Sequence, residues 1–110
     1  LSTSTDMILW DKVLREKNII LKKENWELLW QPFIKTSDDP ASKAHYGFGW
    51  IIDEYNGRKM VMHGGANVGF RSYYTRFVND GLSIIIMTNT DEANPAAIVR
   101  ALADYYFRSK

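Results

Sequence analysis

The sequence predicts an α+β fold in which helices come first, an antiparallel sheet of about four strands follows as a meander, and one more helix closes the chain. Apolar residues recur at helical spacing before residue 34 and after residue 94, whereas residues 46–89 change to a period of two. A chain of 110 residues that is 45% hydrophobic suffices for one domain with a single core. We therefore expect one domain over 1–110, with helices over 5–33, a loop over 34–45, a sheet over 46–89 and a helix over 94–109.

The first helix is expected over residues 5–17. Several N-cap residue types precede it, and Met7, Trp10 and Leu14 lie at i, i+3 and i+7. Asn18 is expected to end this helix.

A second, shorter helix is indicated by four apolar residues at i, i+3, i+4 and i+7, and Pro32 is expected to end it. Two of these residues, Trp26 and Trp30, are candidates for an exposed apolar surface that a larger protein would cover. Residues 35–45 are polar, without periodicity, and contain Asp38 and Asp39; they are expected to form a solvated loop.

The sheet is expected to begin at Tyr46, where aromatic and aliphatic residues alternate with Gly47 and Gly49. We expect these two glycines to let a helix pack closely over the sheet. The pair Asn56-Gly57 predicts a type I′ hairpin.

The remaining strands are expected over 59–64, 70–78 and 82–87, with a turn at residues 79–81. The last of them is apolar on both faces, which is typical of a strand covered on both sides. Asn94 and Pro95 supply a cap and a first-turn proline for the final helix.

The run His63-Gly64-Gly65-Ala66 is the candidate functional site. Two consecutive glycines at the end of an apolar strand let a ligand or another backbone approach the peptide groups closely. The histidine beside them can serve the same ligand, or it can simply pack at the strand end and hydrogen-bond to a neighbour.

Charge and composition exclude several functions. The net charge is +1, with 14 basic and 13 acidic residues interspersed, so we expect no nucleic-acid partner. There is no cysteine, and the two histidines, His45 and His63, lack the spacing of zinc ligands; we expect no metal. No apolar run approaches the ~18 residues of a transmembrane helix.

Three stretches together resemble the serine β-lactamase and penicillin-binding-protein superfamily, in the branch of class C β-lactamases, D-alanyl-D-alanine carboxypeptidases and related esterases. They match the motifs STA-x-D-L-x-x-W, YGYGW and HGG…GF…TN in the order and spacing of the family. The matching residues are Ser2–Met7 with Trp10-Asp11, then Tyr46–Trp50, then His63-Gly64-Gly65 with Gly69-Phe70 and Thr88-Asn89.

The resemblance implies a partial β-lactamase-like fold and a role for each residue of the glycine run. His63, Gly64 and Gly65 correspond to the third motif of the family, which lies on a strand at the edge of the sheet. Ala66 then corresponds to the position whose backbone N–H is one of two oxyanion-hole donors. Gly64 and Gly65 are expected to bind substrate. His63 replaces the commoner lysine, as a proton-handling group or as an anchor for a substrate carboxylate.

The first and second motifs of the family are missing. No serine is followed three residues later by lysine, and neither Tyr-x-Asn nor Ser-x-Asn occurs. We therefore expect this chain to be the C-terminal part of a serine hydrolase and inactive alone, with the N-terminal lobe of the same protein as partner. The resemblance implies a β-lactam, D-alanyl peptide or ester as substrate, no cofactor, and a periplasmic, extracellular or membrane-anchored location.

Two other functions remain open at this point. The strand edge can bind a penicillin or a peptidoglycan fragment without turnover, as a sensor module does. The sheet can also be a structural surface, because exposed strand edges and apolar faces favour association with another copy.

Overall fold

The computed structural model describes residues 1–16 and 19–109. Its one sheet has six antiparallel strands in the order β1-β2-β3-β4-β5-β6, so strands adjacent in sequence are adjacent in space. The elements are α1 (Ser4–Arg15), α2 (Lys23–Leu29), β1 (Ile34–Lys35), β2 (His45–Tyr46), β3 (Ile51–Tyr55), β4 (Arg58–Asn67), β5 (Phe70–Phe77), β6 (Leu82–Thr88) and α3 (Pro95–Arg108).

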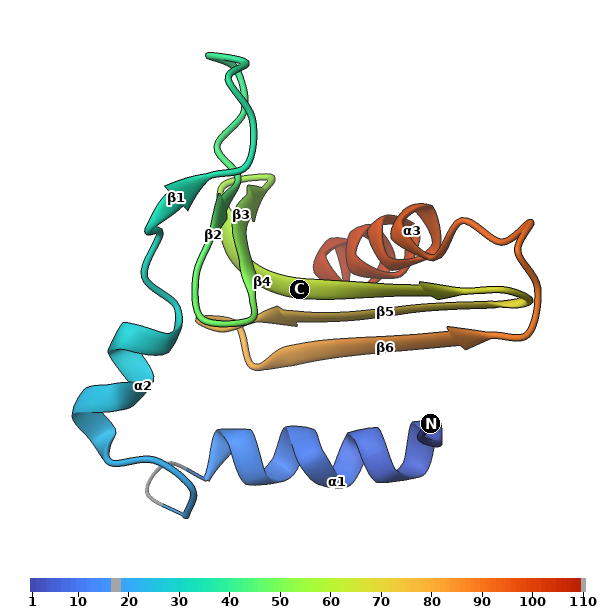
Figure 1. Ribbon diagram of the computed structural model, residues 1–110, viewed down its shortest axis with the longest axis horizontal. Helices are drawn as coiled ribbons and strands as arrows, with labels where there is room; N and C mark the ends of the chain where they lie inside the picture. Colours follow the sequence, from blue (N-terminus) through green and yellow to red (C-terminus); the bar gives the residue numbers. More distant parts are fainter. Residues whose placement is uncertain (17–18, 110) are drawn as a thin grey trace.

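The architecture confirms the predicted α+β class and the meander. Figure 1 shows α3 on one face of the sheet and α1 along the other, with α2 beyond one end of α1. The number of strands is six, whereas about four were predicted. The two additional strands are β1 and β2, which each have only two residues.

The predicted loop and the start of the predicted sheet form a short hairpin. Ile34 pairs with Tyr46, and Lys35 with His45, at the two ends of the expected loop. The chain then reverses, and Tyr46 pairs with Ile51. Gly49 makes this reversal with φ +74°, a left-handed conformation that suits glycine. The prediction of one continuous strand from residue 46 was therefore wrong, because period-two alternation does not show where a chain turns back.

The two glycines of this segment have different roles. A β-carbon on Gly47 would lie 3.0 Å from the carbonyl oxygens of Leu29 and Gln31, which confirms close approach of the α2 end. A β-carbon on Gly49 would meet nothing within 4 Å, so there the prediction of close packing was wrong. The predicted type I′ turn is confirmed, since Asn56 and Gly57 both have positive φ.

The core under α3 lies on one face of the central strands. Five buried residues form this core: Met60, Phe77, Ile84, Val99 and Ala103. Partly buried hydrophobic side chains pack around them. Asn94 caps α3 by accepting a hydrogen bond from the Ala97 N–H, and Pro95 occupies the first turn, as predicted.

A second cluster on the opposite face joins α1 and α2 to β5. Its buried members are Leu14, Trp26 and Tyr74, and Trp30 packs against them. Trp26 is only 2% exposed, so its assignment to an exposed surface was wrong: the sheet of this chain already covers it. Thr3 caps α1 through the Asp6 N–H, while Asn18, the predicted end of that helix, lies outside the described residues.

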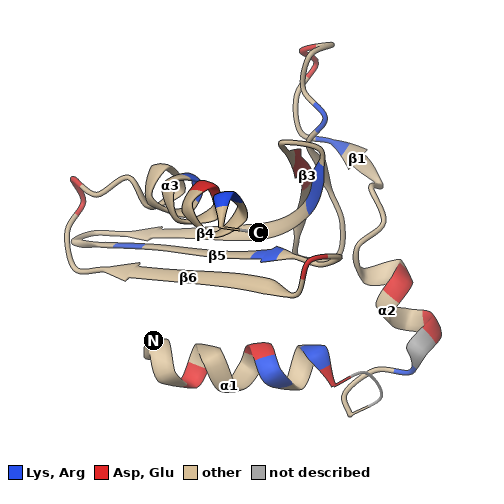
Figure 2. Ribbon diagram, turned by 180° about the vertical axis from the view of Figure 1, so that it is seen from behind, with Lys and Arg blue, Asp and Glu red and all other residues tan. Residues whose placement is uncertain are grey.

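Charged residues are interspersed along α1 and are sparse in the middle of β4 to β6, as Figure 2 shows. Asp38 and Asp39 are exposed, as predicted for the loop. Within residues 1–16 and 19–109, no helix has the length and apolar character needed to cross a bilayer.

Candidate active site

The candidate site is the second half of β4, where the strand becomes an edge. Its first half lies between β3 and β5, and the last pairing with β3 joins Met62 to Ile51. From His63 to Asn67 the strand pairs with β5. This stretch is exposed and therefore leaves one row of backbone groups open to a ligand.

The register determines which backbone groups face the open edge. Two-residue turns close the hairpins at Tyr55–Arg58 and at Asn67–Phe70. Pairs that flank such turns exchange hydrogen bonds, and bonded and non-bonded pairs then alternate along the strand. Counted from either hairpin, the same residues of β4 direct their backbone groups toward β5. Gly64 and Ala66 therefore direct their N–H and C=O groups away from β5, toward the open edge.

Gly64 and Gly65 each leave space for a different neighbouring side chain, on opposite faces of the sheet. A β-carbon on Gly65 would lie 2.5 Å from the Ser72 Oγ, on the face of the sheet that α1 covers. A β-carbon on Gly64 would lie 3.3 Å from the Tyr73 ring, on the α3 face. The bare patch that Gly65 creates is therefore the one that opens toward the start of α1.

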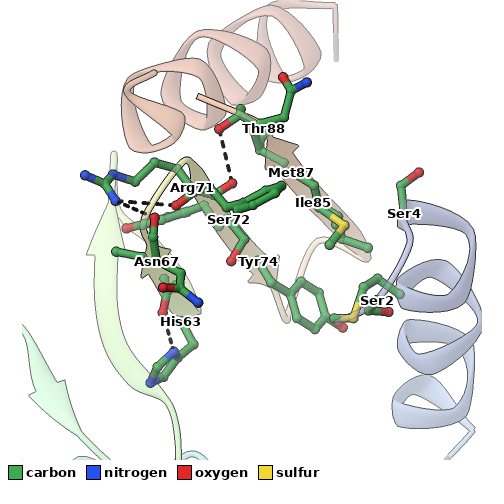
Figure 3. A pocket seen from close by; sticks show the side chains of 18 of the residues that line it. Ser2, Ser4, His63, Asn67, Arg71, Ser72, Tyr74, Ile85, Met87 and Thr88 are labelled. Carbon is green, nitrogen blue, oxygen red and sulfur yellow. Dashed lines mark hydrogen bonds between the residues drawn. The ribbon is translucent and has the colours of Figure 1, made fainter. Parts of the chain in front are cut away.

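A cavity of about 880 Å³ lies over this bare patch. Figure 3 shows side chains of β4, β5 and β6 facing the first residues of α1 across it. The glycine run forms part of its wall, which Tyr74, Ile85 and Met87 extend. The polar side chains of its lining include Ser2, Ser4, His63, Asn67, Arg71 and Ser72.

His63 makes two hydrogen bonds at the mouth of the cavity. Its Nδ1 lies 2.7 Å from the carbonyl oxygen of Gly64, and its Nε2 lies 3.3 Å from the Tyr46 hydroxyl. The structure thus brings together His63, Gly64, Gly65 and Ala66 as one exposed run and adds Tyr46 to it. Tyr46 was not predicted as a site residue, although it begins the second resembling motif.

The turn after β4 is attached to the loop that follows β6. Asp91 accepts a hydrogen bond from the Gly69 N–H at 2.8 Å and forms an ion pair with Arg71 at 3.0 Å. The Thr88 hydroxyl donates to the Arg71 carbonyl at 3.2 Å. These contacts stabilise the end of the open edge.

The described residues hold no group of three or more His, Asp or Glu side chains that could bind a metal ion. His45, the second histidine, is half-buried, and its Nδ1 lies 2.8 Å from the Lys43 carbonyl oxygen.

The structure is thus an antiparallel sheet with helices on both faces, in which the exposed, glycine-rich half of β4 lies beside a cavity. A family model described as Beta-lactamase matches residues 1–106. The chain therefore belongs to the β-lactamase family, within the superfamily of serine hydrolases and penicillin-binding proteins.

Two known proteins support this assignment. A D-aminopeptidase of Gluconobacter oxydans (strain 621H) is 32% identical over 98 residues, which are 89% of this chain and 18% of that protein. The octameric penicillin-binding protein homologue from Pyrococcus abyssi superposes with a TM-score of 0.84 at 25% identity, over 96% of this chain. This chain spans 24% of the length of that structure.

Proposed function

We propose that this chain is the sheet-and-helix part of a serine hydrolase that acts by acyl transfer on a β-lactam, a D-alanyl peptide or an ester. The observation that carries the proposal is the open edge of β4 beside the cavity, with Gly64 and Ala66 directed outward. An extended substrate can add to such an edge as a further strand.

Each residue of the run has a role in this proposal. The N–H of Ala66 donates to the oxyanion that develops on the substrate carbonyl, while Gly64 and Gly65 admit the substrate backbone. A serine from the N-terminal lobe attacks the carbonyl carbon, the bond to the leaving group breaks, and the leaving group takes a proton. Water then hydrolyses the acyl-enzyme. His63 contributes through its hydrogen bond to the carbonyl of Gly64 at the docking edge.

The first test is the intact mass of this chain after exposure to a fluorophosphonate and, separately, to a penicillin. An unmodified mass is expected, because the sequence has no Ser-x-x-Lys. The longer parent protein is expected to gain one adduct on a serine of such a motif. A stoichiometric adduct on a serine of this chain would contradict the proposal.

The second test removes the proposed oxyanion donor in the parent protein. Ala66→Pro deletes an N–H that faces the open edge, where proline is tolerated. It is expected to lower kcat by about 10²–10³-fold, the effect of losing one oxyanion donor. Ala66→Ser keeps the N–H and is the matched control, with near-normal kcat. Equal activity of the two variants would exclude Ala66 as a donor.

A further inference from the structure

Tyr46 reaches the open edge of β4 through the hairpin that the sequence did not predict. The turn at Gly49 places β2 beside β3, and Tyr46 pairs with Ile51, which in turn pairs with Met62. The tyrosine ring lies edge-on to the His63 ring, with centroids 6.3 Å apart and planes at 72°. Tyr46 therefore lies beside the candidate site although it is 17 residues from His63.

The two hydrogen bonds of His63 define its tautomer. The Gly64 carbonyl has no proton to donate, so the nitrogen facing it, Nδ1, must carry the hydrogen. In the neutral ring Nε2 is then an acceptor, and the Tyr46 hydroxyl donates to it. The hydrogen bond at one ring nitrogen thus determines whether the other nitrogen carries a proton.

We infer that Tyr46 is a positioning residue that holds His63 in the Nδ1–H tautomer, with this N–H on the edge carbonyl of Gly64. Both ring nitrogens are then occupied by the protein. His63 in this arrangement orients the docking edge and does not offer a free nitrogen to a substrate carboxylate. Because a tyrosine hydroxyl can also accept, the same ring orientation persists when the imidazole is protonated.

The relevance of this arrangement to substrate rests on the proposed function, but the hydrogen-bond chain does not. Gly64 is one of the two residues whose backbone groups face the open edge. The Nδ1–H therefore occupies one lone pair of a carbonyl that an added strand would use. Without the Tyr46 hydroxyl, the His63 ring is expected to rotate more freely. The hydrogen bond from its Nδ1–H to the Gly64 carbonyl is then expected to be broken part of the time.

The test is the tautomer of His63, measured from the ¹⁵N chemical shifts of its ring in labelled protein at a pH where the ring is neutral. The wild-type protein is expected to show Nδ1 protonated and Nε2 unprotonated. Tyr46→Phe keeps the aromatic ring and removes one oxygen atom. It is expected to shift the tautomer ratio toward Nε2–H by about fivefold, the effect of one ordinary hydrogen bond.

The matched control is Tyr55→Phe, which removes a hydroxyl that donates to Asp104, away from the site. It is expected to leave the His63 tautomer unchanged. A wild-type ring that is mainly Nε2–H, or a ratio that Tyr46→Phe does not move, overturns the inference. Failure of the proposed function would give a different result. The parent protein with Ala66→Pro would then keep full activity, while the His63 tautomer would still respond to Tyr46→Phe as expected.

Discussion

Asp11 is the acceptor of a buried polar cluster that attaches α1 to the sheet. Its carboxylate accepts hydrogen bonds from Tyr74 at 2.5 Å, Ser83 at 2.7 Å and Arg15 at 2.6 Å, and forms an ion pair with Arg76 at 3.0 Å. Asp11 and Arg76 are only 6% and 5% exposed. A buried cation of this kind is tolerated only while its counter-ion is present.

Replacing Asp11 is expected to be strongly destabilising. Asp11→Asn leaves the buried Arg76 without its counter-ion, and the expected loss in the free energy of unfolding is about 3 kcal/mol. Urea unfolding at pH 7 measures it. Asp38→Asn, in the exposed loop, is the control and is expected to change the same quantity by less than about 0.5 kcal/mol. Similar midpoints for the two variants would show that the cluster does not stabilise the fold.

The contribution of Asp11 is also expected to depend on pH. Burial by itself raises the pKa of Asp11, but hydrogen bonds from Ser83, Tyr74 and Arg15 and the charge of Arg76 outweigh it, so the pKa lies below the ordinary value of 3.8. A lowered folded-state pKa means that the stabilisation is complete above the unfolded value and is lost as the pH falls through the folded one. The difference between wild type and Asp11→Asn is therefore expected to be constant from pH 7 to about 5 and to shrink below about pH 4. A difference that grows in acid would refute this assignment.

At the scale of elements, the contact between the α2 end and the β2–β3 turn depends on Gly47. A β-carbon there would also lie 2.7 Å from Ile52 Cδ1, besides the two carbonyl oxygens. Gly47→Ala is expected to lower the free energy of unfolding by about 1–3 kcal/mol, the effect of overpacking a site whose neighbours include backbone.

Gly49→Asn is the comparison for that variant. Asparagine tolerates the left-handed conformation of Gly49, and its β-carbon would have open space. It is expected to cost less than Gly47→Ala in thermal unfolding. The reverse order would mean that the turn conformation matters more than the approach of α2.

At the scale of the whole molecule, apolar side chains remain on the outer surfaces of both long helices. Ile8, Leu9 and Trp10 of α1 are exposed, as are Leu102 and Tyr105 of α3. Large apolar side chains that remain exposed on one element are typical of interaction surfaces. Since the chain spans only 18% of its curated relative, further parts of a parent protein are one way to cover them.

We expect the isolated chain to associate with further copies through α1. Leu9→Glu is expected to shift sedimentation velocity toward the monomer at concentrations where wild type is associated, because the glutamate would be buried without a partner. Thr5→Glu places the same charge on an exposed polar position of α1 and is expected to behave like wild type. A wild-type chain that stays monomeric would remove this expectation.

Local patterns predicted several elements correctly. Asn56-Gly57 predicted its turn, Asn94-Pro95 predicted the start of α3, and the glycine run marked the exposed part of β4. These features depend on the conformational preferences of one or two residues, which can be read from residue type alone. The order of the motifs also indicated the family that the comparison found.

The amino-acid sequence by itself thus determined the α+β class, the meander, the family and the position of the glycine run. Only the tertiary structure decided that the pairing of β3 with β4 ends at Ile51 and Met62, so that the residues of β4 after Met62 form an open edge, and that Trp26 is covered. It also brought Tyr46 to His63 and Tyr74 to Asp11, pairs separated by 17 and 63 residues. Such contacts depend on strand register and on how far each strand extends, which arise from the packing of distant segments and leave no local pattern in the chain.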